Sequence, residues 1–436
     1  MKLPQTIVSR IQRMRADDSA TPNEQNFRTW ALRRPGKKQA ALGVAALAAA
    51  GVVAGTALGL SGGGGAQGAQ SNLSGQQTVS MVSSGSAPQL QVSGNHLVNQ
   101  DGQTVVLHGV DRSGTEFMCV QKGTIFDGPV NAAAIDVMKA KGIDVVRVPL
   151  NEACWNGDSY VNPAASGANY RDAIQAYVKR LNDAGMNVIL DLHWTDGTYT
   201  GPASACVSDQ ATCQKPMPDQ AGAIPFWTSV ANTFKGNDSV IFDLFNEPYP
   251  DQTYQSNMAE AWNCWLHGGS ACPGYSYQVA GMQDMVNAVR STGANNVLML
   301  GGLTWSNDLS GWLSHEPNDP DHDLAASWHS YNFNACSTQS CWNSQIAPVM
   351  AKVPLIAGEI GENDCSDSYV TPLMKWLNSE GGSYVAWTWN SDFNCASGPG
   401  LITNYKGAPT GLGMGVEAML HSDAQKYPTT MVAARK

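Results

Sequence analysis

The chain has 436 residues, of which 43% are hydrophobic and only 14% are charged. Its apolar residues occur in short, interrupted runs, which excludes a largely disordered chain and a polytopic membrane protein. The formal net charge is −10, and because residues 1–38 contribute +6 (nine Lys or Arg against three acids), the remaining chain carries −16. This acidic body repels phosphate backbones, so we expect no nucleic-acid partner, whereas a neutral polysaccharide is compatible with it.

Three segments precede the acidic body. Residues 1–38 are basic, and residues 39–60 form an apolar segment in which positions 40–60 carry no charge. This segment is long enough to cross a bilayer, and the cations before it would keep the N-terminus in the cytoplasm. It is either a membrane anchor or the apolar region of a cleaved export signal. Residues 61–88, rich in Gly, Ser and Gln, predict a flexible linker.

From residue 89 the pattern becomes that of a folded domain. Apolar and polar residues alternate on either side of Asn99–Gly102, which predicts a β-hairpin. Beyond it, short apolar runs alternate with segments of helical periodicity. The eight runs cover residues 105–110, 145–150, 187–194, 240–248, 296–302, 324–331, 354–359 and 383–389.

This arrangement predicts an α/β fold, a closed (β/α)8 TIM barrel over residues 89–425, followed by a tail at 426–436. The alternative is an open, doubly wound sheet. Such a sheet would carry a glycine-rich phosphate loop after an early strand, and the first strand here lacks one.

All ten cysteines lie in the acidic body. Six of them form close pairs whose spacing suits short disulfide-closed loops: Cys206/Cys213, Cys264/Cys272 and Cys336/Cys341. Disulfides imply an oxidising location outside the cytoplasm. Because no CxxC pair occurs, we expect no zinc site.

Polar or ionisable side chains end the otherwise apolar strands. In a TIM barrel the reacting groups stand at the C-terminal strand ends, and an unpaired carboxylate or imidazole in a core is costly. These residues are therefore the candidate site residues: Arg147, His193, Asn246, Glu247, His329, Tyr331, Glu359 and Trp387.

Glu247 on the fourth strand and Glu359 on the seventh would face each other across the barrel mouth. Cleavage of a glycosidic bond requires such a pair, because one carboxyl group protonates the departing oxygen while the other meets the anomeric carbon. A separation of about 5–5.5 Å predicts retention of configuration, and about 6.5–9.5 Å predicts inversion. We expect Arg147 and Tyr331 to keep Glu359 ionised, which leaves Glu247 as the acid.

The other candidates have supporting roles. We expect His193 and His329 to bind sugar hydroxyls or steady the carboxylates, and Asn246 to hold the 2-hydroxyl group or the nucleophile. Glu362 is an alternative nucleophile, although a solvated loop acid is the default for its position. Tryptophans near strand ends can stack on sugar rings, and barrel packing is expected to account for about half of them. They are Trp155, Trp194, Trp305, Trp328, Trp387 and Trp389.

The ordered set of strand-end motifs resembles glycoside hydrolase family 5, the family of many secreted cellulases. The motifs are RVP (147–149), DLHW (191–194), LFNEP (244–248), HSY (329–331) and AGEIG (357–361), with LHGVDRSGTEF before them and WTWN after them. The resemblance covers about residues 90–425. Ile360 departs from the family pattern, which often has an aromatic residue after the nucleophile.

The resemblance implies a retaining mechanism with Glu247 as acid/base and Glu359 as nucleophile. The supporting positions that it implies are Arg147, His193, Asn246, His329, Tyr331 and Trp387.

We therefore expect a retaining endo-β-1,4-glucanase that acts as a monomer on a polysaccharide or oligosaccharide. The alternatives are a family 5 mannanase, another β-glucanase, an exo-glucosidase or a non-catalytic carbohydrate-binding barrel. No metal or other cofactor is expected, since protons and carboxylates suffice. The expected location is extracellular, either secreted or anchored to the outer face of the cell membrane through residues 40–60.

Overall fold

The computed structural model describes residues 86–395 and 398–427. Eight parallel strands close into a barrel in the order β10-β11-β4-β5-β6-β7-β8-β9. The strands are β4 (His108–Asp111), β5 (Val145–Asn151), β6 (Asn187–Trp194), β7 (Val240–Asp243), β8 (Leu298–Gly301), β9 (Leu324–Tyr331), β10 (Leu355–Gly361) and β11 (Ser383–Ala386). The predicted (β/α)8 TIM barrel is confirmed, and each predicted run overlaps one barrel strand, although β4, β5 and β10 end one or two residues beyond their runs.

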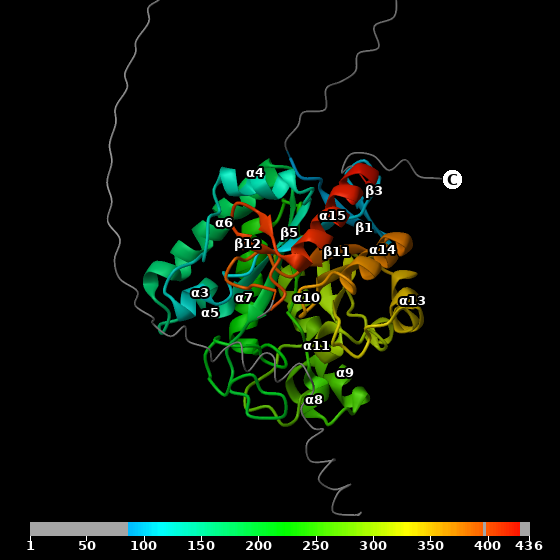
Figure 1. Cartoon of the computed structure of the whole chain (residues 1–436). Helices are drawn as coiled ribbons and strands as arrows, with labels where there is room; N and C mark the ends of the chain where they lie inside the picture. The colour runs from blue at the N-terminus through cyan, green and yellow to red at the C-terminus, as the bar shows by residue number, and fades with distance from the viewer. Residues whose placement is uncertain (1–85, 396–397, 428–436) are drawn as a thin grey trace, which may run out of the picture. The chain divides into compact units, whose positions relative to one another are not determined.

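Helices follow the barrel strands and lie around the barrel (Figure 1). They are α3 (Met118–Gln121), α4 (Ala132–Ala140), α5 (Glu152–Asn156), α6 (Gly167–Asp183), α7 (Gln220–Phe234), α8 (Pro250–Thr253), α9 (Met258–His267), α10 (Met282–Arg290), α11 (Leu303–Ser306), α12 (Gln339–Cys341), α13 (Ala347–Met350), α14 (Val370–Glu380) and α15 (Gly411–Lys426). Helix α6 illustrates why such segments form helices that pack on the barrel. Its buried residues Ile174, Tyr177, Val178 and Leu181 recur with helical spacing, so they share one apolar face.

A small antiparallel sheet precedes the barrel. It consists of β1 (Leu90–Ser93), β2 (His96–Asn99) and β3 (Thr104–Val105). The predicted hairpin around Asn99–Gly102 is confirmed as the β2–β3 pair, and β1 adds a strand that the prediction did not separate. Leu90, Leu97 and Val105 share a buried cluster with the first interior layer of the barrel, so this sheet covers the N-terminal barrel end.

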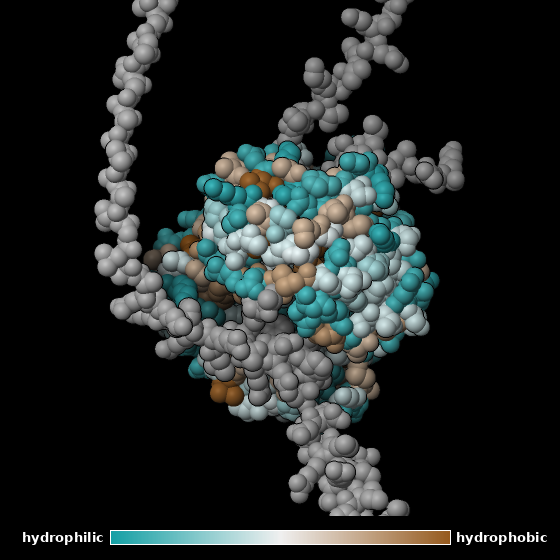
Figure 2. Space-filling view, viewed as in Figure 1, coloured by the Kyte–Doolittle hydropathy of each residue, from teal (hydrophilic) through white to brown (hydrophobic). Residues whose placement is uncertain are grey.

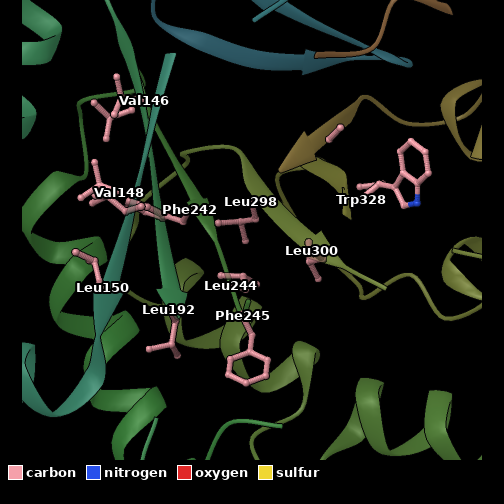
Figure 3. Close-up of a cluster of buried hydrophobic side chains, with 14 of the residues drawn as sticks. Val146, Val148, Leu150, Leu192, Phe242, Leu244, Phe245, Leu298, Leu300 and Trp328 are labelled. Atoms are coloured by element: carbon pink, nitrogen blue, oxygen red, sulfur yellow. The ribbon is translucent and has the colours of Figure 1, made fainter. Parts of the chain in front are cut away.

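Buried apolar side chains form two clusters, one inside the barrel and one between the barrel and the helices. They are separate because successive side chains of a strand point to opposite faces. The interior cluster includes Val145 and Ile189, whereas their neighbours point outward to the helices. Figure 3 shows part of this outer cluster, with labelled residues from several strands. They are Val146, Val148, Leu150, Leu192, Phe242, Leu244, Phe245, Leu298, Leu300 and Trp328.

Five disulfides hold the loops, and the three predicted pairs are confirmed. The bonds are Cys119–Cys154, Cys206–Cys213, Cys264–Cys272, Cys336–Cys341 and Cys365–Cys395. The first and the last join residues 35 and 30 positions apart, too distant for spacing alone to pair them.

A two-stranded sheet of β12 (Ile402–Asn404) and β13 (Ala408–Pro409) precedes α15.

The face of the barrel seen in Figure 2 carries mainly hydrophilic and neutral residues, with apolar residues scattered among them. Within residues 86–395 and 398–427, no helix has the length and apolar character needed to span a membrane. The apolar segment at 39–60, like the basic residues before it and the linker up to residue 85, lies outside the described residues.

Candidate active site

The candidate site is built around Arg147 in the middle of β5. Side chains alternate along a strand, so Arg147 points into the barrel like Val145 two residues earlier. The guanidinium group is fully buried. It lies 2.8 Å from Glu359 and 3.0 Å from each of three aspartates on nearby strands. These are Asp111 on β4, Asp191 on β6 and Asp243 on β7.

One cation therefore faces four acidic side chains. One oxygen each of Asp111, Asp191 and Asp243 is buried without a hydrogen-bond partner within the described part of the chain. Burial raises the pKa of Asp111 well above its usual range and that of Asp243 to about 7, although Arg147 opposes both shifts. Because a buried carboxylate loses its solvation, burial favours the protonated forms of Asp111 and Asp243.

Glu359, on β10, is held at both carboxylate oxygens. Arg147 donates to Oε1 at 2.8 Å, and the Tyr331 hydroxyl, at the end of β9, donates to Oε2 at 2.6 Å. Burial raises the pKa of Glu359, while Arg147, His193 and the Tyr331 hydroxyl act in the opposite direction. The two hydrogen-bond partners expected from the sequence are thus the ones found.

Glu247 follows β7 in the turn formed by Asn246, Glu247 and Pro248. Its side chain is 12% exposed, and His329 Nδ1 lies 3.1 Å from Oε1. Burial raises the pKa of Glu247 well above its usual range, and the charge of Glu359 adds to this shift. In contrast, burial and the nearby cations lower the pKa of His329 well below its usual range, so this imidazole is neutral.

Glu247 and Glu359 face each other across the barrel mouth. One oxygen of each and one nitrogen of His329 all lie within 4.8 Å of one another. These three residues are the only group within the described ranges whose donor atoms are close enough to hold a metal ion. The same spacing places the two carboxyl groups close to the separation at which both can flank a single acetal linkage.

Asn246, His193 and Trp387 lie beside this pair. Asn246 Oδ1 accepts from Arg147 at 2.9 Å, and His193 Nδ1 lies 3.0 Å from Asp191. Burial favours the neutral form of His193, but Asp191, Glu116 and Glu359 together outweigh it and raise the pKa of the imidazole. Trp387 stacks on His193, with the ring centroids 5.6 Å apart. The structure thus brings all eight sequence-predicted site residues into one network.

Glu362 lies elsewhere, and the expectation that it is a solvated loop acid is wrong. Its side chain is fully buried. Oε2 accepts from the backbone N–H groups of Tyr369 and Val370 at 2.9 and 3.0 Å. These amides begin α14 and have no partner within the helix, so the carboxylate satisfies them. Glu362 therefore stabilises a helix start and does not face Glu247.

The strand-end tryptophans divide into two groups. Trp155, Trp328 and Trp389 are at most 5% exposed and belong to the outer core. The remaining three, Trp194, Trp305 and Trp387, are partly exposed at the C-terminal side of the barrel. Only the second group presents indole surface that a sugar ring can reach. The sequence predicted the proportion, but not the members.

Sequence reasoning missed the three aspartates and Gln214. Asp191 and Asp243 were detectable as charged residues inside otherwise apolar strands, which indicates an interior polar layer. Gln214 carried no comparable signal, because it lies in the long loop between β6 and α7. There it donates through Nε2 to the backbone carbonyl of Asn246.

Comparisons with known proteins identify a family whose sequence pattern this chain matches. The family model described as Cellulase (glycosyl hydrolase family 5) matches residues 98–393. The mannan endo-1,4-beta-mannosidase of Cellvibrio japonicus is 24% identical over 330 residues, 72% of this chain and 62% of that protein. Endoglucanase N of Pectobacterium atrosepticum is 23% identical over 322 residues, 72% of this chain and 60% of that protein. The chain thus spans less than two thirds of either relative.

A solved structure shares the fold. The β-glucanase of Saccharophagus degradans in complex with cellotetraose aligns with a TM-score of 0.58 and 18% sequence identity. The alignment covers 77% of this chain and 94% of that one. At this identity the likeness concerns the fold alone.

The helix-start role of Glu362 predicts a loss of stability. Glu362→Ala removes the acceptor of two buried N–H groups, so the free energy of unfolding should fall by about 1–3 kcal/mol. Denaturant unfolding followed by tryptophan fluorescence measures it. The control is Glu380→Ala at the exposed C-terminal end of α14, which should change stability by no more than about 0.5 kcal/mol. Equal losses in both variants would contradict the assigned role.

Proposed function

Because the chain belongs to glycosyl hydrolase family 5, we propose that it is a retaining endo-β-1,4-glucanase. The observation that carries the proposal is the pair of Glu247 and Glu359, whose nearest oxygens lie within 4.8 Å of each other at the C-terminal end of the barrel. This spacing supports direct attack by a carboxylate, since an inverting enzyme needs room for a water molecule between the pair and the sugar.

The proposed reaction has two steps. Glu359 attacks the anomeric carbon while Glu247 gives its proton to the departing glycosidic oxygen, so one C–O bond forms as the other breaks. In the second step Glu247 takes a proton from water, and the resulting oxygen nucleophile displaces Glu359 from the sugar. Two inversions give net retention, and both carboxyl groups return to their starting states.

The electrostatics support this division of roles. Glu359 receives hydrogen bonds from Arg147 and Tyr331, and both favour its ionised form. Burial raises the pKa of Glu247 well above its usual range, and its hydrogen-bond contact is with His329, a neutral imidazole. Two carboxyl groups at this distance separate their pKa values, because both cannot ionise easily together. Glu247 is therefore the group that holds the proton.

The neighbouring residues have supporting roles in this proposal. His329 orients Glu247 through Nδ1, and Asn246 lies against both Arg147 and His193. Trp387 stacks on His193 and supplies an apolar floor on which a pyranose ring can rest. These contacts hold the reacting groups in place before substrate arrives, which lowers the cost of reaching the transition state.

Mannan is the second candidate substrate, because one of the relatives is named a mannosidase. Both polymers are β-1,4-linked and require the same pair of carboxyl groups. We place the enzyme outside the cytoplasm, since five disulfides link the described part of the chain. In this proposal residues 39–60 supply the export signal or membrane anchor.

The proposal predicts that the purified protein releases reducing sugar from carboxymethylcellulose faster than from mannan. Glu247→Gln should lower the rate about 10²- to 10⁴-fold, because it removes the general acid. Glu359→Gln should also abolish most of the hydrolysis, because an amide cannot form the glycosyl ester. A reducing-sugar assay measures all three proteins.

Glu362→Gln is the matched control for these variants, and it should retain most of the activity per folded molecule. Faster release from mannan would replace the glucanase assignment by the mannanase one. Binding of glucan without any release of sugar would overturn the hydrolase proposal altogether.

The Tyr331 hydroxyl predicts a pH effect with a definite sign. It stabilises ionised Glu359 and lowers its pKa, so Tyr331→Phe raises that pKa. Because the nucleophile must be ionised, the acidic limb of the pH profile of kcat/KM should move to higher pH. A lost hydrogen bond to a charged group should also cost about 10- to 100-fold at the optimum.

Tyr369→Phe is the control, since the Tyr369 hydroxyl lies 2.5 Å from Ser330 Oγ rather than beside a catalytic carboxylate. An acidic limb that stays in place in Tyr331→Phe, or that moves equally in Tyr369→Phe, would contradict the proposed role of Tyr331.

A further inference from the structure

The backbone at Glu247 has an uncommon conformation. Its φ angle is +50°, in the left-handed region that residues with a Cβ atom rarely adopt. Such conformations persist only where the surroundings hold them in place, and they often occur at functional sites. The contacts that hold this turn therefore determine where the Glu247 carboxyl group points.

Gln214 makes those contacts from a different part of the chain. Its Nε2 donates to the backbone carbonyl of Asn246 and lies 3.4 Å from that of Glu247. Its Oε1 accepts from Asn246 Nδ2 at 3.2 Å. One amide side chain thus bonds the turn on the backbone and on the side chain at once. We propose that Gln214 is a positioning residue for Glu247, the acid/base of the proposed function on which this inference rests.

The loop that carries Gln214 is itself fixed to the turn. In the β6–α7 loop (residues 195–219), the disulfide Cys206–Cys213 ends one position before Gln214. The buried Lys215 donates to the carbonyl of Ser208, within the segment that this disulfide closes. Immediately after the turn formed by Asn246, Glu247 and Pro248, the Tyr249 backbone N–H donates to the Pro216 carbonyl at 3.0 Å. Gln214 therefore acts from a rigid support and not from a free loop.

The same amide also fixes the orientation of Asn246. Arg147 can only donate hydrogen bonds, so Oδ1 of Asn246 must face it, and Nδ2 must face the other way. There Nδ2 meets Gln214 Oε1 and lies 3.4 Å from His193 Nε2. Gln214 completes a chain of directed hydrogen bonds from the buried cation to the turn of the acid.

Loss of this support should affect proton donation more than attack by Glu359. A general acid works only within hydrogen-bond reach of the departing oxygen, and displacement by about 1 Å can cost roughly 10²-fold. Leaving groups that are already good need little protonation. A misplaced acid is therefore costly for poor leaving groups alone, whereas a general disturbance of the site affects all substrates.

The test compares two aryl β-cellobiosides, phenyl as the poor leaving group and 2,4-dinitrophenyl as the good one. In Gln214→Leu we expect kcat/KM for the phenyl substrate to fall roughly 10²-fold, while the dinitrophenyl value stays within about threefold. The matched control is Gln210→Leu in the same loop, because Gln210 contacts Ser208 and Thr212 through its backbone. It should leave both values unchanged.

Equal losses on the two substrates in Gln214→Leu would overturn the inference. If this variant does not fold, Gln214→Glu takes its place, since an ionised carboxylate of the same shape has no N–H for the two carbonyls. It should show the same selective loss, and wild-type values in it would equally overturn the inference. Glu247→Gln separates the two hypotheses: if it shows no dependence on the leaving group, the proposed acid is wrong, whatever Gln214 does.

Discussion

The whole site depends on one buried cation among four acids. Arg147 is fully enclosed and contacts Asp111, Asp191, Asp243 and Glu359 at 2.8–3.0 Å. A buried guanidinium group is tolerated only when its charge and its hydrogen bonds are matched, and a buried carboxylate set has the same requirement. The three aspartates come from β4, β6 and β7, which lie next to or near β5, whereas Glu359 comes from β10, three strands away in the barrel order, so the curvature of the barrel is needed to bring it to Arg147. Folding and the electrostatics of the site are therefore coupled.

The four acidic side chains around the single cation Arg147 give Glu359 and Glu247 different environments. The favourable contacts of Arg147 are shared among four groups, and Glu359 is the one among them that also receives a tyrosine hydroxyl. Within the described part of the chain, Glu247 has no hydrogen bond with Arg147. Its carboxyl group instead contacts the neutral imidazole of His329. The two glutamates thus differ in environment although they are neighbours. In the proposed mechanism this difference assigns the proton to one and the negative charge to the other.

The backbone around the proposed acid adds a geometric constraint. Arg147 orients Asn246 from inside the barrel, and Gln214 holds the same turn from the β6–α7 loop. Hydrogen bonds from two sides thus hold the turn in which Glu247 adopts its left-handed conformation. Barrel strands carry the proposed nucleophile and its hydrogen-bond partners, whereas the turn of the proposed acid is also hydrogen-bonded to the β6–α7 loop.

Much of this was accessible from the sequence. The apolar runs located all eight barrel strands, because a parallel strand buried on both faces reads as a continuous apolar segment. The grouping of the eight candidate residues could also be predicted, because parallel strands bring their C-terminal ends together.

The missed features depend on contacts between distant segments. Glu362 accepts from amides seven and eight positions later, and Gln214 contacts a turn 32 positions away. The disulfides Cys119–Cys154 and Cys365–Cys395 likewise close long separations. No local pattern encodes such contacts.

Trapping the covalent intermediate tests the central claim most directly. A 2,4-dinitrophenyl 2-deoxy-2-fluoro-β-cellobioside should react once and then stall, because the fluorine slows both steps while the good leaving group sustains the first. Intact-protein mass spectrometry should show one added glycosyl group, and peptide sequencing should place it on Glu359. A label on Glu362, or turnover with inverted products and no label, would contradict the account.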